Sequence, residues 1–285
     1  DYCSKRVVWE QKTVEVPRPA GVDFALTPST NPVCTVYFKI LLALMTRNAI
    51  IVSPHPFAKK CSAEGALAMA KAAEQAGAPA GIIQVITEPT LPLIEHVMKS
   101  PRVSVILATG GSPVVRAAYS SGNPAIGVGP GNAPAFVDAS ADLSAASKRI
   151  IGSKSFDNSI LCTNEGTVVA EEGIADKLLQ ALSKVGGYVA KPDEVDSIRE
   201  YLFGLGSFNV EMVGKSATEI ASRVGIKVPS STKVILTPID RVGTDEALSK
   251  EKLCPVLGFV RVPHVHAGIS TSRALIRMSG AGHSA

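Results

Sequence analysis

The sequence predicts an α/β protein with a parallel sheet in its first half and a second α/β domain after it. Short runs rich in Val and Ile alternate with helical segments at the spacing of βαβ units. These runs are continuously apolar, as expected of strands that are buried on both faces. The chain has 285 residues, of which 46% are hydrophobic, and this suffices for two domains with substantial cores.

The first half is expected to alternate strands and helices after an extended start. Residues 1–20 alternate apolar and polar side chains around Trp9, Val14 and Val16, and such a segment cannot bury itself alone. Strands are then expected at 22–26, 48–52, 82–86, 103–107 and 125–128. Helices are expected between them, at about 35–45, 62–75, 91–99 and 114–119.

Loops at the carboxyl ends of these strands are the expected place for a ligand. They are TPSTNP, SPHP, TEPT and ATGGS. Gly110 and Gly111 let backbone N–H groups approach a phosphate at the start of a helix, although adjacent glycines are not GxGxxG and a simple tight turn is an equal alternative. Asn31 either points its amide into a cleft or serves as a turn or cap residue.

The second half repeats the α/β pattern beyond a boundary that we place at residue 134. GVGPGNAP, at 127–134, is expected to be a linker or a loop shaped against a ligand. Domains of residues 1–134 and 135–285 follow from this boundary. The second is expected to have helices at 172–186, 192–204, 216–225 and 272–278, strands that begin near 166 and 234, and a segment at 251–262 that runs from a polar start into a strand.

Cys162 lies in the polar segment SFDNSILCTNE, directly before the apolar run GTVVA. A cysteine on a polar turn before a strand is placed for use as a nucleophile, and exposed N–H groups or a helix end can lower its pKa. The alternative is a small buried side chain without chemistry.

Composition argues against several other classes of function. The net charge is +4 and only 5% of residues are aromatic, so we expect no nucleic-acid partner. No apolar run is long enough to span a membrane. The five cysteines lack metal-binding spacing, so we expect no metal site and a reducing, cytoplasmic location.

The order of the motifs resembles that of the CoA-acylating aldehyde dehydrogenases. The motifs are TPSTNP, NAIIVSPHP, ATGGS, GPGNAP, SFDN with the following cysteine and glutamate, EKLCPV and GAGH. The chain is similar to the aldehyde half of bifunctional aldehyde–alcohol dehydrogenases and to acylating sulfoacetaldehyde and succinate-semialdehyde dehydrogenases. The resemblance begins near Arg18 and implies a Rossmann-type domain for NAD or NADP, a catalytic domain with the cysteine, and a homo-oligomer when full length. It also implies a fragment that lacks both ends of the family's chain.

The resemblance implies a role for each matched residue. Cys162 would be the nucleophile, Asn31 would donate to the oxyanion together with the Cys162 backbone N–H, and His283 would help acyl transfer to CoA. Glu251 would contact the nicotinamide ribose. The other expected cofactor-binding residues are Thr27, Pro28, Ser53, His55, Thr109, Gly110 and Gly111.

Two departures from the hydrolytic relatives shape the expected reaction. Val128 stands where those enzymes carry a glutamate base that activates water, so a thiol acceptor, coenzyme A, is expected instead. The lysine and glutamate that hold the adenosine ribose in those relatives are absent near Ser53 and Pro56, which leaves NAD and NADP both open. The expected substrates are a small aldehyde or an acyl-CoA. The alternatives are a hydrolytic aldehyde dehydrogenase and an inactive paralogue that only binds nucleotide.

Overall fold

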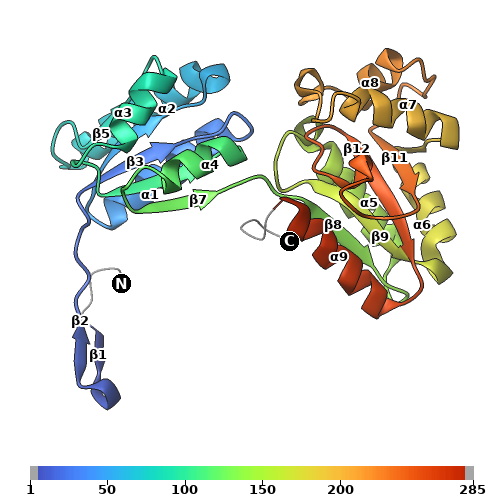
Figure 1. Ribbon diagram of the computed structural model, residues 1–285, viewed down its shortest axis with the longest axis horizontal. Helices are drawn as coiled ribbons and strands as arrows, with labels where there is room; N and C mark the ends of the chain where they lie inside the picture. Colours follow the sequence, from blue (N-terminus) through green and yellow to red (C-terminus); the bar gives the residue numbers. More distant parts are fainter. Residues whose placement is uncertain (1–5, 280–285) are drawn as a thin grey trace. The chain divides into compact units, whose positions relative to one another are not determined.

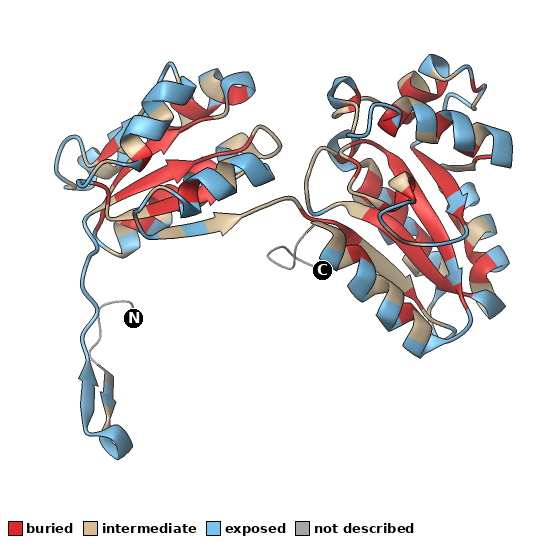
Figure 2. Cartoon of the chain, in the orientation of Figure 1, coloured by how far each residue is buried: buried red, intermediate tan, exposed pale blue. Residues whose placement is uncertain are grey.

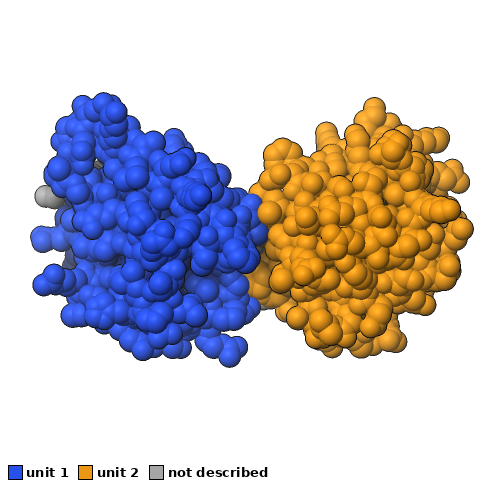
Figure 3. All heavy atoms as spheres, turned by 90° about the horizontal axis from the view of Figure 1, so that it is seen from above, with its two compact units in different colours: residues 1–129 blue, residues 130–285 orange. Residues whose placement is uncertain are grey.

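The computed structural model describes residues 6–279 and divides into two compact units. The units are Asp1–Gly129 and Pro130–Ala285, shown in Figure 3, and each is described by itself. The division falls a few residues before the expected boundary at 134. The reason is that β8 (Ala133–Val137) pairs with β9 (Glu165–Glu171), so its residues belong to the second sheet.

The first described segment is a small antiparallel hairpin. It consists of β1 (Arg6–Val8) and β2 (Thr13–Glu15), joined through a short 3-10 helix at Trp9–Gln11. Figure 1 shows it as an extension from the rest of its unit. Trp9 is 84% exposed and Val14 is 58% exposed, as expected of an extended segment that does not bury itself.

The first unit contains a five-stranded parallel sheet in the order β5-β4-β3-β6-β7. Its strands are β3 (Val22–Leu26), β4 (Ala49–Ser53), β5 (Ile83–Val85), β6 (Val105–Thr109) and β7 (Ala125–Val128). Its helices are α1 (Pro32–Met45), α2 (Lys59–Gln75), α3 (Leu91–Met98) and α4 (Ser112–Tyr119). Successive residues of β3 enter different cores, with Ala25 in one cluster and Phe24 and Leu26 in the other, so both faces are covered.

The strand order of this sheet reverses between β3 and β6. From β3 the chain moves outward through β4 to β5, and then returns to place β6 and β7 on the other side of β3. In open parallel sheets, ligands bind outside the carboxyl ends of the strands at such a reversal. A ligand is therefore expected near the residues that directly follow β3 and β6.

The second unit contains another five-stranded parallel sheet, in the order β10-β11-β12-β9-β8. Besides β8 and β9, its strands are β10 (Gly187–Val189), β11 (Val234–Ile239) and β12 (Val256–Val262). Its helices are α5 (Leu143–Ser155), α6 (Glu172–Lys184), α7 (Pro192–Phe203), α8 (Ala217–Arg223) and α9 (Val265–Ser279). Two apolar clusters cover its two faces, and Figure 2 shows β11 and β12 as mostly buried.

Three sequence-based expectations are corrected in detail. The expected loop at 127–134 is shorter, because Gly127 and Val128 belong to β7 and the segment from Ala133 onward belongs to β8. Strand β10 was not expected, since three residues at a sheet edge give too short a pattern. Helix α9 begins at Val265, several residues before the expected start.

Side-chain caps explain where several helices begin. Asp142 accepts hydrogen bonds from the backbone N–H groups of Ser144 and Ala145, at 2.9 and 3.1 Å, at the start of α5. Ser216 caps α8 in the same way through the Glu219 N–H at 3.2 Å. Among the helices of residues 6–279, none combines the length and the apolar composition needed to cross a bilayer.

Candidate active site

Cys162 lies at the amino end of β9, after a turn with unusual backbone geometry. Asp157, Asn158 and Ser159 have φ angles of 49°, 49° and 60°, which place three successive non-glycine residues in the left-handed region. Such residues persist only where the surrounding structure enforces them, and they are enriched at functional sites. This turn joins α5 to the segment that contains Cys162.

Polar contacts hold this turn in place. The amide of Asn164 donates a 2.6 Å hydrogen bond to the Ser153 carbonyl in the last turn of α5. Ser159 is completely buried, and its hydroxyl has no hydrogen-bond partner within the described part of the chain. The segment before Cys162 is thus fixed by packing from the inside and by an amide contact across the turn.

The environment of Cys162 raises the pKa of its thiol. Burial is the main cause, the negative charge of Glu251 is the second, and a hydrogen bond from its own backbone N–H opposes both. The sequence-based idea that N–H groups lower this pKa is therefore corrected, because desolvation and Glu251 outweigh the single N–H contact. Glu251 is close enough to Cys162 for its charge to act on the thiol.

Glu251 reaches this position because β12 is the neighbour of β9 in the sheet. It lies in the loop before β12, so it meets Cys162 at the same, amino-terminal edge. Its carboxylate accepts a 3.3 Å hydrogen bond from the N–H of Gly131, which leads into β8. Burial raises the pKa of Glu251 to about 7, while the Gly131 contact and the charges of Lys154 and Lys252 oppose that rise.

In the first unit, two buried hydroxyls at the carboxyl edge lack partners. Thr27 follows β3 and is 4% exposed, and Ser53 ends β4 and is 1% exposed. Neither side-chain oxygen has a hydrogen-bond partner within residues 6–279, although the Thr27 N–H donates to the Ser53 carbonyl at 3.0 Å. Buried hydroxyls are normally paired, so unpaired ones beside the strand-order reversal suit a polar ligand. Pro28, which follows Thr27, is also buried.

The glycine pair after β6 suits the approach of a phosphate. Gly111 is the N-cap of α4 and offers no side chain to the helix start, which leaves N–H groups open to an anion. Thr109 ends β6, and the N–H of Gly110 donates to the Val128 carbonyl at 3.1 Å, which ties this loop to β7. No Cβ could be added at Gly127 without lying 2.6 Å from a Val115 methyl, so the α4–β7 contact requires glycine there.

His55 and Asn31 flank these loops. The ring nitrogen Nδ1 of His55 accepts the Phe57 N–H at 3.2 Å, and burial lowers the pKa of the imidazole. Asn31 is the N-cap of α1, but its side chain makes no capping hydrogen bond. Its Oδ1 accepts from the Thr35 hydroxyl at 3.1 Å, which leaves Nδ2 to donate elsewhere. The side chain of Asn31 therefore does not cap α1.

Lys39 is a component of this edge that sequence analysis missed. It is 4% exposed, and its ammonium donates to the carbonyls of Leu26 and Leu107, both at 2.7 Å. These carbonyls belong to β3 and β6, the two strands between which the order reverses. Burial lowers the pKa of Lys39 to about 7. One charged residue within the apolar run TVYFKILLALM was the available signal.

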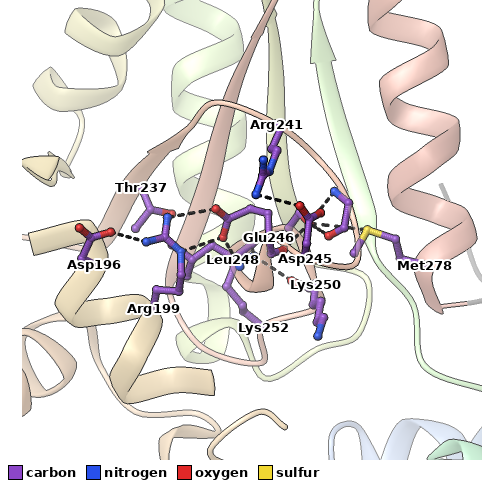
Figure 4. Close-up of polar contacts among 12 residues, drawn as sticks. Asp196, Arg199, Thr237, Arg241, Asp245, Glu246, Leu248, Lys250, Lys252 and Met278 are labelled. Carbon is purple, nitrogen blue, oxygen red and sulfur yellow. Dashed lines mark hydrogen bonds and ion pairs between the residues drawn. The ribbon is translucent and has the colours of Figure 1, made fainter. Parts of the chain in front are cut away.

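A separate pocket of about 310 Å³ lies at the carboxyl end of β11, but its charged groups are not available to bind a ligand. It contains Arg199 and Arg241, both of which already pair with carboxylates. Arg199 contacts Glu246 at 3.0 Å, and Arg241 contacts Asp245 at 2.8 Å, as Figure 4 shows. We therefore regard this pocket as part of the framework around the loop that precedes β12.

The two units hold different parts of the expected site. Cys162 and Glu251 lie together in the second unit, whereas Asn31, Thr27, Ser53, His55 and the residues from Thr109 to Gly111 lie in the first. His283 lies outside the described residues. Within residues 6–279, no group of three or more His, Cys, Asp or Glu side chains is arranged to hold a metal ion.

Comparisons with known proteins agree on one family. The model of the aldehyde dehydrogenase family matches residues 3–188. An aldehyde-alcohol dehydrogenase of Clostridium acetobutylicum is 40% identical over 94% of this chain and 31% of its own length. The crystal structure of an acetylating aldehyde dehydrogenase from Geobacillus thermoglucosidasius is 41% identical, with a TM-score of 0.92, over 96% of this chain and 61% of that one.

A third comparison concerns the chemistry of the site. The structure of a Rhodopseudomonas palustris propionaldehyde dehydrogenase, with bound CoA and an acylated cysteine, is 32% identical with a TM-score of 0.86. The match covers 93% of this chain and 60% of that one. The chain therefore spans about a third of the bifunctional relative and less than two thirds of the two solved relatives.

Proposed function

The chain belongs to the aldehyde dehydrogenase family, and on this premise we propose that it carries the catalytic core of a CoA-acylating aldehyde dehydrogenase. The proposed enzyme oxidises an aldehyde with NAD or NADP and transfers the acyl group to CoA, which gives an acyl-CoA and the reduced cofactor. The reaction is reversible. Unit Asp1–Gly129 binds the nicotinamide cofactor and unit Pro130–Ala285 supplies the cysteine. Small aldehydes and acyl-CoA thioesters are the proposed partners.

Cys162 carries the acyl group in this proposal. Its thiolate adds to the aldehyde carbonyl, and the alkoxide that forms needs hydrogen-bond donors. Asn31 Nδ2 and the Cys162 backbone N–H are the proposed donors. The Asn31 amide hydrogens have no hydrogen-bond acceptor within residues 6–279, which supports that assignment. The nicotinamide, when bound, accepts the hydride. A thioester then remains on Cys162, and the CoA thiol takes the acyl group with help from His283.

The first unit supplies the groups that suit a dinucleotide. The glycine pair at Gly110 and Gly111 and the unpaired hydroxyls of Thr27 and Ser53 support binding of its phosphates and sugars at the carboxyl edge. His55 and Thr109 border the same edge. Glu251 is proposed to accept hydrogen bonds from the nicotinamide ribose, in keeping with its placement beside Cys162.

Val128 is the observation that favours CoA over water as the acceptor. It ends β7, and its side chain has no group that takes a proton. Since attack by water needs a general base, the thioester is expected to react instead with an acceptor whose own thiol ionises, such as CoA. The acylated cysteine and bound CoA of the Rhodopseudomonas palustris relative support the same choice.

Assembly and location complete the proposal. We expect a homo-oligomer of the full-length protein, and the exposed apolar residues of the β1–β2 hairpin support an assembly role for it. A cytoplasmic location remains a prediction from the cysteine pattern. Among residues 6–279 no disulfide forms between the cysteines, which are Cys34, Cys61, Cys162 and Cys254, and this is consistent with it.

The decisive experiment measures CoA-dependent reduction of NAD and NADP with a panel of short aldehydes. Acyl-CoA should accumulate in step with the reduced cofactor, and Cys162→Ser should abolish both while the protein still binds cofactor. Free acid formed steadily without CoA would support the hydrolytic alternative. Cofactor binding without turnover, for any aldehyde or acyl-CoA, would support the inactive paralogue.

A further inference from the structure

Two lysines are buried directly behind the Cys162–Glu251 edge. Lys154, in the last turn of α5, is completely buried, and Lys252, in the loop before β12, is 3% exposed. Within residues 6–279 neither forms an ion pair closer than 4.0 Å. Burying an ammonium group is costly unless polar partners satisfy it, so the contacts of these two groups have to be identified.

Both ammonium groups bind main-chain carbonyls of a single short segment. Lys154 Nζ donates to the carbonyl of Lys252 at 3.2 Å. Lys252 Nζ donates to the carbonyl of Lys250 at 2.8 Å and also to that of Leu248. Figure 4 shows Lys252 among these residues. The segment 248–252 is therefore tied to α5 at the carbonyl of Lys252, and it is closed on itself by the contacts of Lys252 with the carbonyls of Leu248 and Lys250.

These contacts bracket Glu251. The carbonyl of Lys250 is part of the peptide bond that joins Lys250 to Glu251, and the carbonyl of Lys252 lies one peptide bond beyond Glu251, so the two lysines hold the backbone on both sides of Glu251. The Gly131 N–H then meets the carboxylate at 3.3 Å. Because the carbonyls on both sides of Glu251 are held, its backbone has little freedom to move, and its side chain stays directed toward Gly131.

Other anchors hold the start of the same loop. Arg199 on α7 makes two 3.0 Å contacts with the carboxylate of Glu246. Asn132 donates to the carbonyl of Ser249 at 2.7 Å. These contacts end at Ser249, and the lysine contacts continue across Glu251. The position of Glu251 thus depends on the two lysines more directly than on Arg199 or Asn132.

We propose that Lys154 and Lys252 are positioning residues of the cofactor site, which hold Glu251 where the nicotinamide ribose is bound. The inference rests on the proposed function for the identity of that ligand. The two ammonium groups also place positive charge behind the Glu251 carboxylate. These charges oppose the rise that burial causes in the pKa of Glu251. Burial lowers the pKa of Lys154 to about 8 and that of Lys252 to about 7, so the charges are lost as the pH rises above neutral.

Hydrogen exchange tests the positioning role without any reaction. The N–H groups of Leu248, Ser249 and Lys250 donate to Glu246 or Ala247, at 2.9, 3.0 and 3.1 Å, so they exchange slowly while the loop is fixed. In Lys154→Met and in Lys252→Met, their exchange should accelerate at least about tenfold. Peptides from β11 and β12 should keep their wild-type rates.

Two control variants make this result specific. Lys39→Met removes another buried ammonium group, but in the first unit, and should leave exchange at 248–250 unchanged. Lys177→Met removes an exposed lysine of α6 and should also leave it unchanged. Wild-type exchange at 248–250 in both loop variants would overturn the proposal. Uniform acceleration across the whole second unit would overturn it as well, since it would show general destabilisation.

A double-mutant cycle tests the link to the ligand. Binding of NADH is titrated by fluorescence in wild type, Lys252→Met, Glu251→Gln and the double variant. Lys252→Met should weaken binding about tenfold, but it should add little in the Glu251→Gln background, because it acts through Glu251. Independent, additive losses would overturn the proposal. If wild type bound neither NADH nor NADPH, the proposed function would fail, while hydrogen exchange would still decide whether the lysines fix the loop.

Discussion

Cys162 and Glu251 are electrostatically coupled, because β9 and β12 are neighbours in the sheet and both residues lie at the amino ends of their strands. The charge of Glu251 raises the pKa of the Cys162 thiol, and burial raises the pKa of Glu251 itself to about 7. Near neutral pH, protonation of Glu251 therefore favours ionisation of the Cys162 thiol.

The coupling predicts a more acidic thiol when Glu251 is neutralised. In Glu251→Gln no negative charge opposes the thiolate, so the pKa of Cys162 should fall and its alkylation by iodoacetamide at pH 7 should accelerate by several fold. The measurement is the pH dependence of alkylation, followed peptide by peptide in a mass spectrometer. Cys34 and Cys61, which are exposed in the other unit, serve as internal controls. An unchanged or higher pKa at Cys162 would contradict the coupling.

The acceptor preference predicts a single turnover without CoA. Because Val128 provides no base, the acyl group should stay on Cys162, and aldehyde with oxidised cofactor should give at most one reduced cofactor for each chain. Stopped-flow absorbance measures the burst, and intact-mass analysis detects the acylated protein. Addition of CoA should release the acyl group and restore steady turnover. Steady formation of free acid in buffer alone would show that water is the acceptor.

Sequence analysis predicted the strands well where the pattern was local. The apolar runs at β3 and β7 appear with the expected bounds, because a continuous apolar run between turn residues is itself the signal. Cys162 and Glu251 were both found, but their proximity follows from strand order, which residue patterns do not contain. The pKa direction of Cys162 was wrong for the same reason: burial and the charge of Glu251 are properties of the folded sheet.

The buried lysines show a different limit of sequence analysis. Lys39, Lys154 and Lys252 are all 4% exposed or less, yet lysine is ordinarily a surface residue and carries no mark of burial in a sequence. Only the apolar neighbours of Lys39 hinted at its place. The carbonyls that accept from Lys154 and Lys252 lie in a loop without a regular sequence pattern, so their role can be recognised only in the folded structure.

The proposed role of His283 predicts a selective defect in acyl transfer. A base of pKa near 6.5 is suited to take the proton of a thiol whose pKa is near 8.5, to order of magnitude. His283→Ala should therefore slow acyl transfer to CoA more than the hydride step, and the defect should shrink as pH rises because CoA then ionises unaided. Single-turnover and steady-state rates are compared across pH. Equal losses in both, independent of pH, would assign His283 a structural role.

The burial of Lys39 predicts that its contribution to the free energy of unfolding depends on pH. Burial lowers its pKa from 10.5 to about 7, so between these values the unfolded chain binds a proton that the folded chain does not. The free energy of unfolding should therefore rise with pH across this window, by up to about 1.4 kcal/mol per pH unit from this one group. Below about pH 7 both states are protonated, and the cost of the buried ammonium is present in full.

Comparison of Lys39→Met with wild type isolates this contribution. The variant leaves the carbonyls of Leu26 and Leu107 without the ammonium donor, so it should be less stable than wild type at pH 7. Because the variant has no group to titrate there, its deficit should widen as pH rises from 7 to 10. Urea unfolding followed by circular dichroism at several pH values measures the difference, and the contributions of Lys154 and Lys252 cancel in it. Lys71→Met, at an exposed position of α2, should follow the wild-type curve. Parallel curves for Lys39→Met and wild type would show that Lys39 keeps an ordinary pKa despite its burial.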